Sequence, residues 1–362
     1  MAQEKSPDSV KGQDFVKEIF ERKKEDASSS KKISSLFGGA ALKTQQARPA
    51  SERKPKEVSS VGIETCAGSF NVAQLAKFNG GWEVYRSAVD AQAGANGSLK
   101  QVLSEKGFKG DAVIGLSADD VEFRIINLPP MPAGEVDGAV AWGVAEALGI
   151  DARRIHDLSI DYAVISGEGR SSGGRKAFVA AVRKEIVLGK MKAVSDSGLT
   201  VVAVEPAPLA LYASFCDFFS PDPSKLTLLL NIGYASSALV IGAGRDVYSV
   251  RGLSLADKIL KGSLADDGSV ASDPSVSSAL ENLIVAVEHS FKSVSNEFPN
   301  PSAVSLGAIA VSGAGARYKG LAAFLKKTFN VQAEAFDPLG AGAELASAVG
   351  LAMRGKKDDE EV

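Results

Sequence analysis

The 362-residue chain is poor in the residues that metal and redox sites need. It has two cysteines, Cys66 and Cys216, and two histidines, His156 and His289, with no metal-binding spacing among them. Zinc sites, haem sites and disulfide frameworks need several such residues in a set pattern. The sequence therefore argues against these classes of site and predicts a protein of a reducing, cytoplasmic compartment.

Long apolar runs and concentrated positive charge are also missing. No stretch reaches the roughly 18 to 20 apolar residues that span a bilayer, and the charged N-terminus MAQEKSPDSVKGQDF lacks the apolar core of a signal peptide. The net charge of −3 offers no basic surface for nucleic acid. We therefore expect no nucleic-acid partner, and a location at the inner membrane only through other proteins.

Residues 1–58 differ in composition from the rest of the chain. They hold 13 lysines and arginines against nine acidic residues, and their large apolar groups gather in two short segments, 15–20 and 33–42. This composition predicts a disordered basic arm. Two interpretations stay open for it: a solubilising arm, or a segment that docks on a partner or on a membrane surface.

From Val61 onward the pattern becomes strand-like and is later repeated. Three antiparallel strands separated by glycine turns, a short helix and the apolar strand at 112–118 form a βββαβ unit. The apolar stretch LTLLLNIG at 226–233 restarts this order, and a long helix, two further helices and two strands follow it. The sequence therefore predicts an α/β protein with two lobes built on duplicated βββαβα cores.

A separate block of strands and helices interrupts the first unit. The family resemblance described below implies that this block is an inserted subdomain and that the first lobe resumes after it. The expected divisions are the arm at 1–58, the start of the first lobe at 59–120, the inserted subdomain at 121–205, the return to the first lobe at 206–225, the second lobe at 226–338, a C-terminal helix on the first lobe at 339–354 and a charged tail at 355–362.

Three glycine turns each follow a strong strand, within 62–68, 233–234 and 313–315. Their surroundings, VGIETCAGSFNVAQL, LLLNIGYASSALVI and AIAVSGAGARYKGL, resemble the PilM family of type IV pilus assembly proteins. The stretch VEFRIINLPPMP resembles the subdomain called 1C, which that family shares with the division protein FtsA. The resemblance runs from about Val58 to Arg354 and implies the actin-like fold of actin, Hsp70 and sugar kinases.

The resemblance implies ATP, with Mg²⁺ as its metal, between the lobes. Two hairpins close on the phosphates from either side, because glycine and small residues let backbone N–H groups approach the oxygens. The third turn opens a helix near the adenosine. The residues that the resemblance places at the nucleotide are Gly62, Gly68, Ser69, Asn71, Gly233, Tyr234, Ala235, Ser236, Gly313, Ala314, Gly315 and Tyr318.

The sequence departs from the family pattern at the two acidic positions of these loops. Glu64 stands where the family usually has Asp, and Asn231 replaces the Asp that precedes Ile-Gly. Both are candidates for catalysis and for a water-mediated Mg²⁺ site, and for each the alternative is an ordinary turn residue. Because a neutral amide replaces an anionic ligand, we expect a degenerate or very slow ATPase rather than an active enzyme.

Five further positions bear on the site. Cys66 lies in the first loop but is expected to be inert, and His289 on the long helix is expected to pack or to face solvent. Lys258 either is solvated or reaches a phosphate across the cleft. The Gly-Gly pair that the family has after the third strand of the second lobe is replaced by Leu255 and Ala256.

The resemblance implies an adaptor that holds the cytoplasmic N-terminal segment of PilN, an inner-membrane pilus protein. We expect the segment in a groove between the first lobe and the inserted block, on exposed apolar positions of the strand at 121–128. Further expected partners are pilus motor or platform proteins and further copies in a ring. An FtsA-like filament protein is a second interpretation, but the tail GKKDDEEV has no amphipathic helix. A sugar kinase is a third, but no general-base Asp is apparent.

Overall fold

The computed structural model describes residues 54–66, 69–79, 81–90, 98–165, 175–233, 236–253, 274–298 and 301–354. Residues 1–53 of the predicted arm and the predicted tail lie outside the described residues, as do Gly68, Tyr234, Ala235, Leu255, Ala256 and Lys258. The boundary predicted at residue 58 is too late, because a strand already begins at Glu57.

Two five-stranded sheets repeat one strand order. In each sheet the first three strands are antiparallel, and the last two extend it in parallel. The first sheet runs β3 (Gly81–Asp90), β2 (Ser69–Phe78), β1 (Glu57–Cys66), β4 (Asp111–Leu116) and β8 (Thr200–Pro206). The second runs β11 (Asp246–Leu253), β10 (Ser237–Ala243), β9 (Leu226–Ile232), β12 (Leu306–Ser312) and β13 (Gln332–Ala335). This identical order shows the duplication that the sequence predicted.

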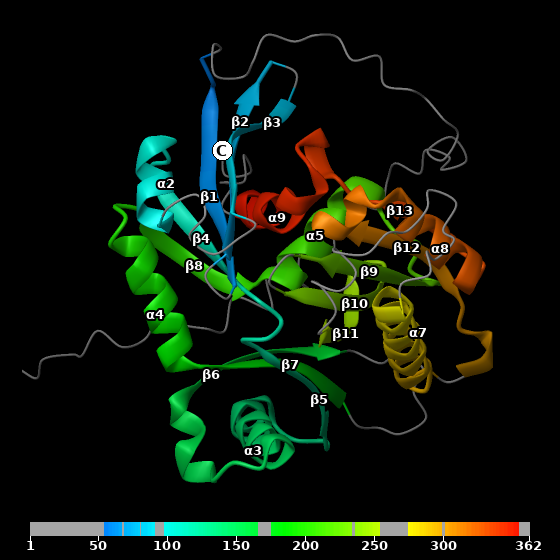
Figure 1. Cartoon of the computed structure of the whole chain (residues 1–362). Coiled ribbons are helices and arrows are strands. Elements are labelled where there is room, and N and C mark those ends of the chain that lie inside the picture. The colour runs from blue at the N-terminus through cyan, green and yellow to red at the C-terminus, as the bar shows by residue number, and fades with distance from the viewer. Residues whose placement is uncertain are drawn as a thin grey trace, which may run out of the picture.

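Two helices lie between the sheets and join the lobes (Figure 1). Helix α5 (Ala207–Phe219) packs on one face of the second sheet, and α9 (Ala346–Arg354) packs on the facing side of the first. The two helices also contact each other. Because both faces of β9 are covered, all seven of its residues are buried, which explains its unbroken apolar sequence.

The outer faces carry the remaining lobe helices. Helices α2 (Leu99–Glu105) and α4 (Lys184–Ser195) cover the first sheet, and α7 (Pro274–Ser295) and α8 (Lys319–Phe329) cover the second. Each contributes buried leucines, valines or alanines to the core on its side. None of the helices in the described part of the chain is long and apolar enough to cross a bilayer.

A third, smaller sheet lies beside both lobes and contains β5 (Glu122–Leu128), β7 (Arg175–Arg183) and β6 (Leu158–Ile165). Helix α3 (Val136–Leu148) covers one face and ends at Gly149, whose left-handed φ of 63° suits glycine. The rings of Phe123 and Phe178 stack with their centroids 5.8 Å apart, and both residues pack in the cluster around α5 and β11. The inserted sheet is therefore anchored on the second lobe as well as on the first.

Candidate functional site

The carboxyl ends of β1 and β9 meet at the first turn of α9. In open α/β sheets this edge is where ligands bind. Glu64 near the end of β1 and Asn231 near the end of β9 are 8% and 7% exposed, and Ser347 of α9 is 2% exposed. The structure thus brings the two predicted acidic-position residues to one buried serine between the lobes.

A chain of hydrogen bonds connects these residues across the lobes. The Ser347 hydroxyl bonds the Glu64 carboxylate, and Asn231 Nδ2 donates to Ser347 Oγ at 3.3 Å. Ser312 Oγ at the end of β12 donates to Asn231 Oδ1 at 3.3 Å, and Asn71 Nδ2 of β2 donates to Glu64 Oε2 at 3.1 Å. Buried polar groups need such partners, so this network helps to hold the lobes in register.

Burial raises the pKa of Glu64 above its ordinary value. Hydrogen bonds from Asn71 and Ser347 and the charge of Lys190 hold back part of that rise, because they favour the carboxylate. The folded protein therefore binds a proton at Glu64 more tightly than the unfolded chain does. The stabilisation from this proton is fully present below pH 4.5 and is lost as the pH rises through the raised pKa.

A Glu64→Gln variant should gain stability relative to the parent as the pH rises. Glutamine keeps hydrogen-bonding capacity at this position but has no charge to bury. The stability of the variant therefore does not depend on protonation of residue 64. Urea unfolding of both proteins at several pH values from about 4.5 to 8 checks this, since linkage makes the difference between the curves grow with pH. Parallel curves would mean that Glu64 is not buried as a carboxylate.

The site fits a divalent cation poorly. Mg²⁺ prefers carboxylate and water oxygens, but Glu64 already accepts from Asn71 and Ser347, and the facing Asn231 is neutral and bonded on both sides. Across the residues that the structure describes, no group of three or more His, Cys, Asp or Glu side chains could hold a metal ion. No step through Mg²⁺ is therefore assigned to these residues.

Packing explains several of the glycines predicted to contact a nucleotide. A Cβ on Gly62 would lie 2.0 Å from the Ala348 carbonyl oxygen of α9. A Cβ on Gly315 would lie 2.6 Å from Ile232 Cβ. Gly313 has a left-handed φ of 74°, and a Cβ there would lie 2.5 Å from the Ile232 carbonyl oxygen. These glycines permit close backbone contacts whether or not a nucleotide binds.

The other predicted contacts are arranged around the same edge. Ser69 begins β2, and Gly233 and Ser236 close the β9–β10 hairpin through a 3.0 Å hydrogen bond from Gly233 N to Ser236 O. Ala314 is buried, and Tyr318 packs against the second-lobe core. Contact of these residues with a nucleotide stays a prediction.

An apolar groove of about 520 Å³ lies between the first lobe and the inserted sheet. Its walls come from α4, β6 and β8, and the buried cluster Leu116, Val121, Ala180 and Val182 lies among its lining residues. Leu188 of α4 and Val202 of β8 line it and are 62% and 53% exposed. Large apolar side chains this exposed in one groove suggest a protein contact.

The strand at 121–128, expected to offer exposed apolar positions to the groove, offers none. Phe123 and Ile125 of β5 pack in the cluster around α5 and β11, and Ile126 packs under α3. Within the stretch 121–128, Val121 alone lines the groove. A groove lies between the first lobe and the inserted block, but the strand named for it was wrong, because β5 lies on the opposite edge of the inserted sheet from β6.

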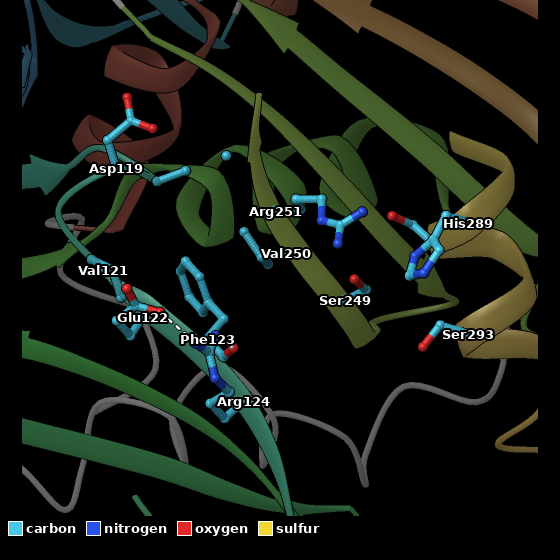
Figure 2. Close-up of a pocket in the computed structure, with 13 residues that line it drawn as sticks. Asp119, Val121, Glu122, Phe123, Arg124, Ser249, Val250, Arg251, His289 and Ser293 are labelled. Atoms are coloured by element: carbon cyan, nitrogen blue, oxygen red, sulfur yellow. Dashed lines mark hydrogen bonds and ion pairs between the residues drawn. The ribbon is translucent and has the colours of Figure 1, made fainter. Parts of the chain in front are cut away.

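A second cavity, of about 490 Å³, is polar and lies between β5, β11 and α7. Figure 2 shows His289 and Ser293 of α7 and Arg251 of β11 on one side, with Asp119 and Glu122 on the other. His289 is exposed and lines this cavity. The glycine-turn residues in the described part of the chain are not among its lining residues.

Three residues of the site have no signal in the sequence. Ser347 lies in a run of small residues, and Ser312 and Lys190 lie in ordinary strand and helix patterns. Glu205 of β8, 1% exposed, is a fourth residue of interest, since Arg354 Nε of α9 lies 3.2 Å from its Oε2. Glu64 of β1 pairs with Gly115 of β4, and Gly115 pairs with Glu205 of β8, so the two glutamates lie in one row across the first sheet. This relation becomes visible only when the strand pairing is known.

Comparison with known proteins identifies the fold. No protein-family model and no curated protein sequence matches the chain. A solved structure described as a PilM–PilN type IV pilus biogenesis complex matches with a TM-score of 0.62 and 23% identity, covering 82% of this chain and 98% of that chain. The cytoplasmic domain of EpsL, from the type II secretion system of Vibrio cholerae, matches with a TM-score of 0.44 and 11% identity, covering 83% of this chain and 97% of that chain.

The first likeness and the duplicated sheets agree with one another. They show the actin-like, two-lobed α/β fold that the sequence predicted. The resemblance to the PilM family is confirmed as a likeness of fold.

Proposed function

We propose that this protein is an actin-fold adaptor in the assembly of a type IV pilus or a related secretion machine. In this role it binds the cytoplasmic N-terminal segment of an inner-membrane PilN-like protein, which holds it at the membrane from the cytoplasmic side. Pilus motor or platform proteins and further copies in a ring are its other proposed contacts. The observation that carries the proposal is the groove with the exposed Leu188 and Val202.

The groove suits an extended apolar segment. It is flanked by β8, the outermost strand of the first sheet, and by β6, the outermost strand of the inserted sheet. An outermost strand offers backbone N–H and C=O groups to an added strand, while apolar positions beside it select side chains. The likeness in fold to a structure of PilM with PilN supports a PilN-like segment as the occupant.

In this role the protein binds ATP weakly between the lobes and does not hydrolyse it. The residues at the acidic positions are already hydrogen-bonded to Ser347, Ser312 and Asn71, and only Glu64 is a carboxylate. A nucleotide here would stabilise one arrangement of the lobes, which is a binding effect and needs no hydrolysis.

Charged substitutions in the groove are expected to abolish most of the partner affinity. Leu188→Glu or Val202→Glu would place a carboxylate beneath the bound segment, where it lacks water, so the Kd should rise at least about tenfold. Both side chains are exposed in the free protein, and its stability should be retained. Fluorescence anisotropy with a labelled peptide of the PilN-like protein's N-terminal segment from the same organism measures this.

Val285→Glu is the matched control. Val285 of α7 is 63% exposed, as apolar and as accessible as Leu188, but it does not line the groove. Its Kd should stay within about twofold of the parent value, as expected for a surface substitution. Failure of the peptide to bind the parent, or equal binding by the groove variants, would overturn the proposed function.

A further inference from the structure

Helix α4 contacts both the apolar groove and the strand end that leads to the first predicted phosphate loop. Val187, Leu188 and Met191 line the groove. Lys190, between Leu188 and Met191 in sequence, points to the end of β1 instead: its Nζ donates to the Thr65 carbonyl oxygen and to Thr65 Oγ1, both at 2.8 Å.

Lys190 is also held from a second strand end. Its Nζ lies 3.1 Å from Asp120 Oδ2, and Ser117 at the end of β4 donates its backbone N–H and hydroxyl to the same carboxylate oxygen. The Lys190 and Asp120 side chains are 19% and 24% exposed, so the pair is partly shielded from water. Charge-assisted hydrogen bonds in such surroundings are among the stronger ones.

All three N–H groups of the Lys190 ammonium therefore have acceptors. The Lys190 ammonium therefore does not need a phosphate as a partner, and its contact with the end of β1 is through Thr65. Thr65 follows the buried Glu64 and lies within the stretch 62–68, where the first phosphate loop is predicted. A displacement of α4 would thus move the end of β1, because the ammonium holds both.

We propose that Lys190 is a positioning residue that couples the groove to the cleft, so that a segment bound in the groove tightens the binding of a nucleotide. This inference rests on the proposed function, since it needs both ligands. A segment packed on Leu188 and Met191 fixes α4 and, through Lys190, fixes Thr65 in the arrangement that the loop needs. Coupling free energies are reciprocal, so the nucleotide tightens the segment by the same factor.

The test is a thermodynamic cycle on the full chain. A fluorescent ATP analogue is titrated with and without a saturating concentration of the PilN-like peptide. In the parent the peptide should lower the Kd of the analogue about fivefold or more, at the lower end of ordinary coupling. In Lys190→Met both ligands should still bind, but the factor by which the peptide lowers the Kd of the analogue should fall below about twofold.

Two further variants make the result specific. Lys192→Met removes a lysine from the same helix whose partner Asp196 is exposed, and it should keep the parent factor. Thr65→Val removes the hydroxyl acceptor at the other end of the contact, and it should reduce the factor even if Lys190→Met does not fold.

The outcomes separate the two proposals. No binding of the peptide to the parent overturns the proposed function and the coupling with it. Binding of both ligands with no coupling in the parent overturns only the coupling. An undiminished factor in Lys190→Met or in Thr65→Val would likewise remove Lys190 from the connection while the adaptor function stands.

Discussion

Replacing Arg354 with methionine is expected to lower the free energy of unfolding by about 3 kcal/mol, because it leaves a buried carboxylate without its cation. Arg354 Nε lies 3.2 Å from Glu205 Oε2, and the two side chains are 17% and 1% exposed. Methionine fills a similar volume, so the loss reports the charge and not a cavity. Urea denaturation at neutral pH measures it.

The exposed pair on α4 provides the control. Lys192 and Asp196 lie 3.0 Å apart with side chains 76% and 58% exposed, so Lys192→Met should change stability by no more than about 0.5 kcal/mol. A double variant, Glu205→Met with Arg354→Met, should recover most of the loss, since both charges are then gone. A loss under about 1 kcal/mol in Arg354→Met would show that this pair is not what holds the end of α9.

A Gly62→Ala variant is expected to lose about 3 kcal/mol of stability, at the upper end for overpacking, because the added methyl group meets backbone atoms. Its Cβ would lie 2.0 Å from Ala348 O and 2.5 Å from Ala352 N. Helix α9 would have to move away from β1, and on its other side Gly350 already lies against α5, with Ala210 O 2.6 Å from the Cβ position. The shift would also disturb Ser347, which joins the lobes.

Gly138→Ala is the opposite case and serves as the control for Gly62→Ala. Gly138 is in α3, is exposed, and has nothing within 4 Å of a Cβ position. Alanine favours the helix there by up to about 1 kcal/mol, so this variant should be more stable than the parent. Thermal unfolding of the two variants in parallel checks both directions, and equal stability of Gly62→Ala and the parent would contradict the close packing of α9.

In the proposed function, the groove and the proposed coupling would together let the protein respond to a membrane partner. Helix α4 presents Leu188 to the groove and Lys190 to Thr65. Because Glu64 and Asn231 are joined through Ser347, a shift at the end of β1 would reach the second lobe through one hydrogen-bonded serine. An adaptor built this way would report an occupied groove as a change in nucleotide affinity.

Local pattern was sufficient for the fold but not for the groove. The apolar run at β9 and the strand-turn-strand pattern after Val61 follow from covered faces and glycine turns, both of which leave a mark in neighbouring residues. Nothing in the residues next to Leu188 and Val202 indicates that they are exposed, because an apolar residue type is the same in the sequence whether its side chain is buried or exposed. The strand at β5 was chosen for the groove in error because strand pairing puts it at the far edge of the inserted sheet.

The sequence by itself determined the duplicated sheets, because periodicity and turn chemistry act over a few residues, while the resemblance to the PilM family singled out Glu64 and Asn231. Tertiary structure alone decided that Glu64 is buried, that Ser347 bridges it to Asn231, and that Lys190 holds Thr65. These partners are separated by more than a hundred residues in the chain. Their meeting depends on how two sheets stack about α5 and α9, and no local preference encodes that distance.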